Sequence, residues 1–211
     1  MTRARARPGG RSAAKQEAVL RGGLTVFARD GYTRAAIDAI AREADVSTRT
    51  IYNHYADKAG LFAAVIVASA TRVARARTAL LAEHLDRPDP DLAGLARAWA
   101  TPDPEFAEHF ALVLQVRAEV HHVPAAAREA WLDAGPRRVQ AALAARIGRL
   151  AERGLLHAED PDRAAAHFVA LVAGEVSSRT VNGLLPMPPA EIHASADAGL
   201  AAFLRAYGPR R

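Results

Sequence analysis

The stretch that decides the fold is IDAIAREADVSTRTIYNHYADK, residues Ile37–Lys58. In its first part, apolar residues recur at the spacing of a short helix with one apolar face, at Ile37, Ile40, Ala41 and Ala44. Ser47 follows as an N-cap for a second short helix. Two short helices joined by a three-residue turn are typical of a helix-turn-helix, whose second helix enters the major groove of DNA.

The turn and the second helix carry the chemistry of this motif. Asp45 tolerates the positive φ that such a turn needs. In the helix predicted from Thr48 to Tyr55, Ile51 and Tyr55 point inward. The polar side chains left outside can meet base edges or phosphates, and Arg49 has the fork that reads guanine. The candidate DNA contacts here are Thr48, Arg49, Thr50, Asn53 and His54.

Two more helices flank the motif. A first helix begins at Ser12, carries Leu20, Leu24 and Phe27 on one face, and ends before Gly31. Gly22 and Gly23 in its middle cost roughly 1 kcal/mol each relative to alanine, so they imply strong packing or a close neighbour. A fourth helix, capped by Asp57, is expected to run to about Glu83.

The net charge of +5 is confined to the same end of the chain. Residues 1–60 hold 11 basic and 6 acidic residues, and the remainder holds 17 of each. The first eleven residues lack apolar periodicity, so we expect a flexible basic arm in which Arg3, Arg5 and Arg7 either enter the minor groove or have no target. A basic end on a neutral body predicts contact with a polyanion at that end.

Beyond residue 84 the pattern is helical, with breaks at prolines. Helices are expected at 92–100, 102–122 and 191–207, from Asp160-Pro161 to about Asn182, and from Pro124 past Gly135-Pro136 to about Arg153. No stretch alternates with the period of a strand. We therefore predict an all-α chain of about nine helices, with an arm at 1–11, a three-helix DNA-binding head at 12–60, and a body at 61–211 for ligand binding and dimerisation.

Composition excludes several other classes. The chain has no cysteine, so it has no disulfide, iron–sulfur ligands or thiol nucleophile. No uninterrupted apolar run approaches the roughly 18 residues of a membrane span, and no apolar stretch follows the arginine-rich N-terminus. We expect a cytoplasmic protein that does not contact a membrane.

Three spaced elements together resemble the signature of the TetR (tetracycline-repressor-like) regulators: Gly31-Tyr32, Ile40–Ser47 and Ile51–Lys58. The resemblance covers about residues 15–65. It implies a three-helix head, a helical ligand-binding body and a two-fold dimer built from the last two long helices. The body also resembles the AefR-type C-terminal domain, through Arg153-Gly154-Leu155-Leu156 followed by Asp160-Pro161.

The resemblance also assigns two residues to the DNA backbone, Tyr52 and Lys58. The chain departs from the family pattern at Asp45, where glycine is usual, and at Gly22-Gly23, where alanines are usual. Alanines 35 and 36 replace threonines before the second helix, and Ala59-Gly60 replaces acidic residues. We expect Thr33 to take over the cap of the second helix, and we assign no DNA contact to the two alanines.

The body offers two sets of candidates. Aromatic and polar residues between 99 and 131, with one further aromatic, either line an effector pocket or belong to the core: Trp99, Phe106, Phe110, Leu114, Arg117, His121, Trp131 and Phe168. The helix from Pro161 is apolar nearly all round, which predicts burial on two sides, one of them against a partner subunit. The candidate dimer contacts are Val169, Val172, Val176, Leu200 and Phe203.

Other polar residues in the body have simpler interpretations. Glu175 is expected to pair with Arg179 at i+4 rather than to bind a ligand. The histidines lack the spacing of metal ligands, so we expect no metal and no cofactor. Ser177 and Ser178 stand outside any GxSxG motif, which argues against a hydrolase.

Two regulatory functions fit these features. In the first, a dimer holds two heads on a palindromic operator in double-stranded DNA, and a small-molecule effector shifts it to a non-binding state. In the second, the protein binds DNA without an effector. A ligand that weakens operator binding distinguishes the first from the second.

Overall fold

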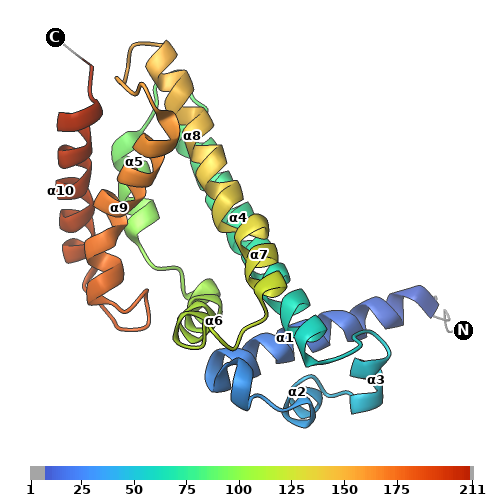
Figure 1. Ribbon diagram of the computed structural model, residues 1–211. Helices are drawn as coiled ribbons and strands as arrows, with labels where there is room; N and C mark the ends of the chain where they lie inside the picture. The colour runs from blue at the N-terminus through green and yellow to red at the C-terminus, as the bar shows by residue number, and fades with distance from the viewer. Residues whose placement is uncertain (1–7, 210–211) are drawn as a thin grey trace, which may run out of the picture. The chain divides into compact units, whose positions relative to one another are not determined.

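The computed structural model describes residues 8–209, and every regular element in that range is a helix (Figure 1). The all-α prediction is confirmed. The elements in chain order are α1 (Pro8–Arg34), α2 (Ile37–Glu43), α3 (Thr48–Tyr52), α4 (Lys58–Leu85), α5 (Leu92–Ala100), the 3₁₀ helix η1 (Pro104–Phe106), α6 (Ala107–Ala118), α7 (Ala125–Ala134), α8 (Pro136–Glu152), α9 (Pro161–Arg179) and α10 (Pro189–Tyr207).

The chain divides into two compact units. The head unit comprises the residues up to Ala70 together with Ala111–Leu132, and the body unit comprises Thr71–Phe110 and the chain from Asp133 onward. The head unit is therefore larger than residues 12–60, because the first turns of α4 and most of α6 and α7 pack with it. Sequence spacing does not reveal such packing, since these segments are distant in the chain.

Aromatic and branched side chains fill the core of the head unit. Phe27 of α1 and Phe62 of α4 are fully buried and meet edge to face, with 4.9 Å between ring centroids. Ile40 of α2 and Ile51 of α3 are also buried in this core, as their spacing predicts. Each short helix is thus held by one deep apolar anchor, and its polar side remains at the surface.

The two unusual glycines of α1 are explained by a close neighbour. A Cβ placed on Gly22 would lie 2.9 Å from the backbone nitrogen of Ala44, at the end of α2. Real Cβ atoms do not approach a backbone atom so closely. The glycine therefore allows α1 and α2 to pack at short distance, which is the second of the two explanations that the sequence suggested.

The body unit is built around α9 and α10, which lie side by side in Figure 1, with α5 and α8 packed against them. Phe168 of α9 and Phe203 of α10 meet edge to face in the core, with centroids 5.3 Å apart. Capping carboxylates start two of these helices: Asp91 accepts from the Gly94 amide at 2.7 Å, and Asp160 from the Arg163 amide at 2.9 Å. The predicted helix start at Asp160-Pro161 is confirmed.

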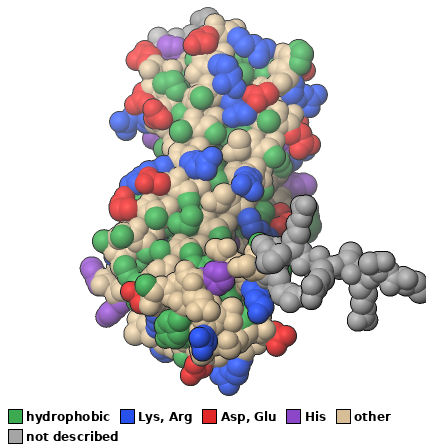
Figure 2. Space-filling model, turned by 90° about the vertical axis from the view of Figure 1, so that its right-hand side faces the viewer, with side chains coloured by type: hydrophobic (Ala, Val, Ile, Leu, Met, Phe, Trp, Pro, Cys, Tyr) green, Lys and Arg blue, Asp and Glu red, His purple; other side chains and the backbone are tan. Residues whose placement is uncertain are grey.

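Charged side chains of both signs share the surface. On the face shown in Figure 2, lysines and arginines lie among acidic residues rather than in one continuous basic area. Several form ion pairs within the body unit, such as the two-pronged pair of Arg97 with Asp197 at 2.8 Å. Exposed pairs of this kind contribute little to stability, about 0–1 kcal/mol each.

The helix α4 is longer and more apolar than the sequence pattern led us to expect of any segment. By length and composition α4 could cross a membrane, which for a single helix is weak evidence. Its apolar side chains are buried in the two cores, Leu61, Phe62, Val65 and Ile66 in the head unit and Leu81 and Leu85 in the body unit. This is the behaviour of a core helix.

Candidate nucleic-acid interface and ligand-binding residues

The turn between α2 and α3 adopts the predicted conformation. Asp45 has a φ of 51°, in the left-handed region that the turn needs, although it is not glycine. The Val46 amide then donates to the Ala41 carbonyl at 3.0 Å, which closes the end of α2. An aspartate at this point can thus redirect the chain as the motif requires.

Ser47 caps the recognition helix α3. Its Oγ accepts from the Thr50 amide at 3.2 Å and lies 3.0 Å from the Thr50 hydroxyl. The predicted cap is confirmed. Ile51 faces the core, whereas Arg49 and Tyr52 are exposed, Tyr52 to 55%. An aromatic residue that is half exposed on a short helix is available to a partner.

The other predicted DNA contacts differ in how far their side chains are exposed to solvent. Asn53 and His54, which follow α3, are exposed, and Thr48 and Thr50 are half-buried. The structure thus brings together the polar side chains of α3 that the sequence singled out, and their contact with DNA remains a prediction.

Lys58, the first residue of α4, is held by the end of α1. Its Nζ donates to the Thr33 carbonyl at 2.9 Å and lies 5.1 Å from the centre of the Tyr32 ring. Burial lowers the pKa of Lys58, and the nearby Glu119 carboxylate opposes this shift. The ammonium group therefore has a structural partner in the head in addition to its predicted phosphate.

The role expected for Thr33 is wrong. The N-cap of α2 is Ala36, which makes no side-chain capping bond, and no bond of the Thr33 side chain replaces it. Instead the Thr33 amide donates to Glu119 at 2.9 Å. Just before it, Gly31 has a φ of 77° and kinks α1, which continues to Arg34 instead of ending before the glycine as the sequence predicts. The carboxylate of Glu119 thus fixes the chain that leads into α2.

A surface hollow of about 570 Å³ lies beside the turn of the motif. Its basic residues are Lys15 of α1 and Arg42 of α2, and Thr50 of α3 lines it too. Sequence reasoning missed Lys15 and Arg42 as candidate contacts. Lys15 is one of only two lysines in the chain, which was the signal available for it. These two cations extend the candidate interface from α3 to α1 and α2.

The predicted arm residues Arg3, Arg5 and Arg7 lie outside the described residues.

The predicted pocket residues fall in both units. Trp99, Phe106, Phe110 and Phe168 belong to the body unit, and Leu114, Arg117, His121 and Trp131 belong to the head unit. Phe168 is buried in the core, whereas Arg117 and His121 are exposed. Trp99 belongs to the same core as Phe168, Phe106 is also buried, and Phe110 is half-buried.

Two polar residues near these aromatic side chains, the half-buried Arg77 and the buried His109, were not singled out from the sequence. Arg77 of α4 donates to the Trp99 carbonyl at 2.9 Å and lies 4.9 Å from the centre of that ring, and burial lowers its pKa although the charge of Asp103 opposes this. His109 is 7% exposed, and burial together with the charge of Arg72 lowers its pKa to about 4. Neither has a sequence signal, because α4 and the segment at 99–110 meet only in the folded chain.

The candidate dimer contacts lie mostly in the core of one chain. Val172, Val176, Leu200 and Phe203 are at most 7% exposed within a single subunit, so a partner cannot reach them. Val169 is half-buried. The predicted pair of Glu175 with Arg179 is present at 3.3 Å, and Ser195 also donates to Glu175 at 2.9 Å. The inner faces of α9 and α10 therefore serve the core, and any partner must meet their outer faces.

Among the residues that the structure describes, no group of three potential ligands is placed to hold a metal ion.

The turn geometry, the capped recognition helix and the helical body define a helix-turn-helix DNA-binding protein. Residues 19–65 match the family described as bacterial regulatory proteins, tetR family, and residues 101–209 match the C-terminal domain of AefR-like transcriptional repressors. The chain belongs to the TetR family of transcriptional regulators. Both resemblances seen in the sequence are thereby confirmed.

Solved structures agree with this assignment. A TetR-family regulator from Mesorhizobium loti is 28% identical, with a TM-score of 0.81 over 94% of this chain and 98% of that one. The flavonoid-responsive regulator FrrA is 27% identical, with a TM-score of 0.69 over 94% and 100%. A regulator from Saccharomonospora viridis, solved with choline, shares the fold at 21% identity and a TM-score of 0.67, over 93% and 98%. No curated protein sequence matches the chain.

Proposed function

We propose that this protein is a cytoplasmic, non-enzymatic repressor that a small-molecule effector releases from a palindromic operator. The observation that carries the proposal is a capped recognition helix joined to a body that matches AefR-like repressors over residues 101–209. The family works on operator DNA as dimers. Repression then follows from occupancy of the operator, and release follows from an effector that binds the non-binding state more tightly.

DNA contact is assigned to the exposed side of the motif. Arg49 reads one base pair, while Tyr52 and Lys58 contact the backbone. We add Lys15 and Arg42 as backbone contacts, since both line the hollow beside the turn. Because these contacts are mostly with phosphates, operator affinity should fall steeply as salt rises.

The dimer is assigned to the outer faces of α9 and α10. Each helix carries a row of exposed small or apolar residues, which would allow two helices to approach closely: Ala166, Ala170, Leu171 and Gly174 on α9, and Ala194, Ala198, Ala201 and Leu204 on α10. Leu171 and Leu204 are 39% and 38% exposed, although leucines are usually buried. A second copy that covers these faces would bury both leucines.

The effector is assigned to the aromatic region of the body unit, with Trp99, Phe106 and Phe110 as apolar contacts and Arg77 as the orienting group. Flavonoids are the first probes, because FrrA, at 27% identity, is flavonoid-responsive. The experiment follows operator binding by fluorescence anisotropy while a flavonoid panel is titrated. Release by one compound, lost in Trp99→Ala but retained in His121→Ala, supports the proposal.

Operator binding that no compound in a broad panel changes would favour the alternative, a regulator without an effector. That result would leave the DNA contacts assigned to the head unaffected, and it would contradict the assignment of effector binding to the aromatic region.

A further inference from the structure

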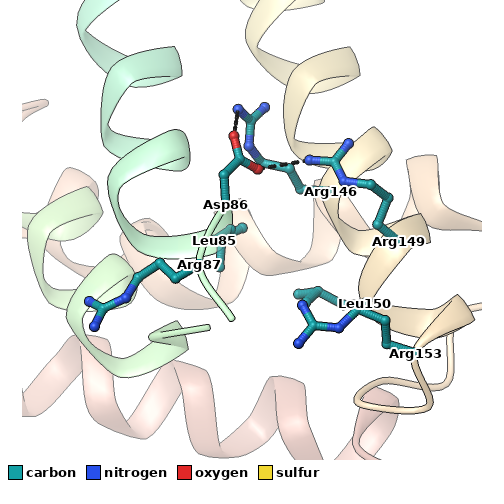
Figure 3. Close-up of a pocket in the computed structure, with 7 residues that line it drawn as sticks. All are labelled: Leu85, Asp86, Arg87, Arg146, Arg149, Leu150 and Arg153. Carbon is teal, nitrogen blue, oxygen red and sulfur yellow. Dashed lines mark hydrogen bonds and ion pairs between the residues drawn. The ribbon is translucent and has the colours of Figure 1, made fainter. Parts of the chain in front are cut away.

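A second surface hollow, of about 340 Å³, lies at the C-terminal ends of α4 and α8 in the body unit (Figure 3). Three arginines of one helical face line it, Arg146, Arg149 and Arg153, with Leu85 and Leu150 as apolar neighbours. Arg87 is at its margin and points away from the others in Figure 3. Asp86 is the only acidic residue in the lining. Two of the guanidinium groups, those of Arg146 and Arg149, hold the Asp86 carboxylate, and the third, that of Arg153, lies apart from it.

The carboxylate of Asp86 shows what this arrangement can hold. One of its oxygens accepts from Arg146 at 2.6 Å and the other accepts from Arg149 at 2.8 Å. Burial alone would raise the pKa of Asp86, but the hydrogen bonds and charges of the two arginines outweigh burial and lower it. Bridging of one oxyanion by two guanidinium groups is the geometry with which arginine binds carboxylates and phosphates.

The single carboxylate of Asp86 does not pair with all three arginines, Arg146, Arg149 and Arg153. Arg153 donates only to a neutral acceptor, the Pro88 carbonyl, at 2.6 Å. Arg146 is 12% exposed, and its buried Nε has no hydrogen-bond partner among the described atoms. Because this Nε is closed off from solvent, an anion in the hollow would meet the exposed Arg149 and Arg153 instead. The bond of Arg153 to Pro88 also joins the end of α8 to the segment after α4, but it leaves the positive charge of Arg153 without a counter-charge in the lining.

We propose that this hollow binds a small phosphate-bearing anion, whose oxygens bridge Arg149 and Arg153 and compete with the Asp86 carboxylate. A phosphate group brings about two negative charges, which match the excess of guanidinium groups better than one more carboxylate does. The volume is at the lower end of that of small-ligand sites. The site involves none of the residues assigned to DNA or to the effector.

Isothermal titration of the full-length protein with pyrophosphate, at constant ionic strength in sodium chloride, tests this proposal. Arg153→Ala, which leaves the Asp86 pairs intact, should weaken binding at least tenfold. Asp86→Asn should strengthen binding about tenfold, because it removes the competing charge.

Asp197→Asn is the matched control, since it removes a carboxylate from the exposed pair with Arg97, and it should leave binding unchanged. Circular dichroism verifies that each variant is folded. Pyrophosphate binding that is equal in the wild type and Arg153→Ala would overturn the proposal and reduce the cluster to a clamp between helices. Binding that is lost in Lys15→Ala but not in Arg153→Ala would place the anion in the head and would overturn it as well.

Discussion

The head and the body of this regulator differ in how their functional groups are assembled. In the head, the recognition helix and its cap come from six consecutive residues, and helical spacing alone decides which of them face outward. In the body, the groups of interest come from distant segments: Arg77 contacts Trp99, and Asp86 contacts residues of α8 more than fifty positions away. In the head, neighbouring residues determine how the functional side chains are placed, whereas in the body the packing of distant segments determines it.

The largest effect that tests this contrast is expected on the outer face of α9. Ala170→Arg places a charge on the proposed dimer contact, so the protein should be monomeric by light scattering. Operator affinity should fall by about 10²–10⁴, because the second head is no longer held near its half-site. Ala145→Arg, on the exposed side of α8, is the control and should remain a dimer. A dimeric Ala170→Arg protein would remove α9 from the interface.

The next effect concerns His109, which the body keeps neutral. Its pKa of about 4 lies below the ordinary 6.5, so only the unfolded chain binds a proton between these values. The contribution of His109 to stability is therefore present above pH 6.5 and is lost as pH falls toward 4, by at most about 3 kcal/mol.

Urea unfolding at several pH values measures this loss. The dependence on pH between 6.5 and 4 should be flatter in His109→Leu than in the wild type. His121→Leu, at an exposed position, should behave as the wild type does. Identical curves for the wild type and His109→Leu would show that His109 is not buried as described.

A pair of glycines in the head should respond to the same substitution with opposite signs. Gly22→Ala should destabilise the protein by about 1–3 kcal/mol, because the new Cβ meets the backbone of Ala44 at 2.9 Å. Gly60→Ala should stabilise it by up to about 1 kcal/mol, since the nearest atom there is 3.5 Å away and alanine favours helix. Thermal denaturation compares the two, and equal shifts would contradict the close packing of α1 on α2.

The smallest effect separates the two kinds of DNA contact within the head. Lys58→Ala should lower the slope of log affinity against log salt by about one, with the same loss for all sequences. Arg49→Ala should leave the slope nearly unchanged and relax the preference at one base pair. Anisotropy titrations at several salt concentrations measure both. Equal slopes for the wild type and Lys58→Ala would leave Lys58 with its bond to Thr33 as its only role.

Sequence reasoning predicted most of the head because its signals are local. The turn at Asp45, the caps at Ser47 and Asp57, and the inward side chain of Ile51 all follow from neighbouring residues, and the structure confirms them. The cap expected from Thr33 is wrong because a residue 86 positions away, Glu119, binds its amide instead. No spacing rule within the head could have revealed that partner.

The positions of the helices in the body could be predicted from the sequence, but the side of each helix that faces the core could not. Asp160-Pro161 marked the start of α9 correctly, and the range predicted for α5, residues 92–100, is confirmed. Apolar content alone could not show which side of α9 faces its own core, so Val172 and Val176 were assigned to a partner that cannot reach them. Small exposed residues such as Ala170 leave no hydrophobic signal, although they are what a closely packed interface uses.

Selection of bound sequences from a pool of random duplex DNA tests the central claim most directly. If two capped recognition helices read DNA as a symmetric pair, the wild type should enrich an inverted repeat, and Arg49→Ala should lose the preference for the same base pair in both half-sites. A pool that stays random, or that enriches one asymmetric site with no repeat, would contradict the account of this protein as a dimeric helix-turn-helix regulator.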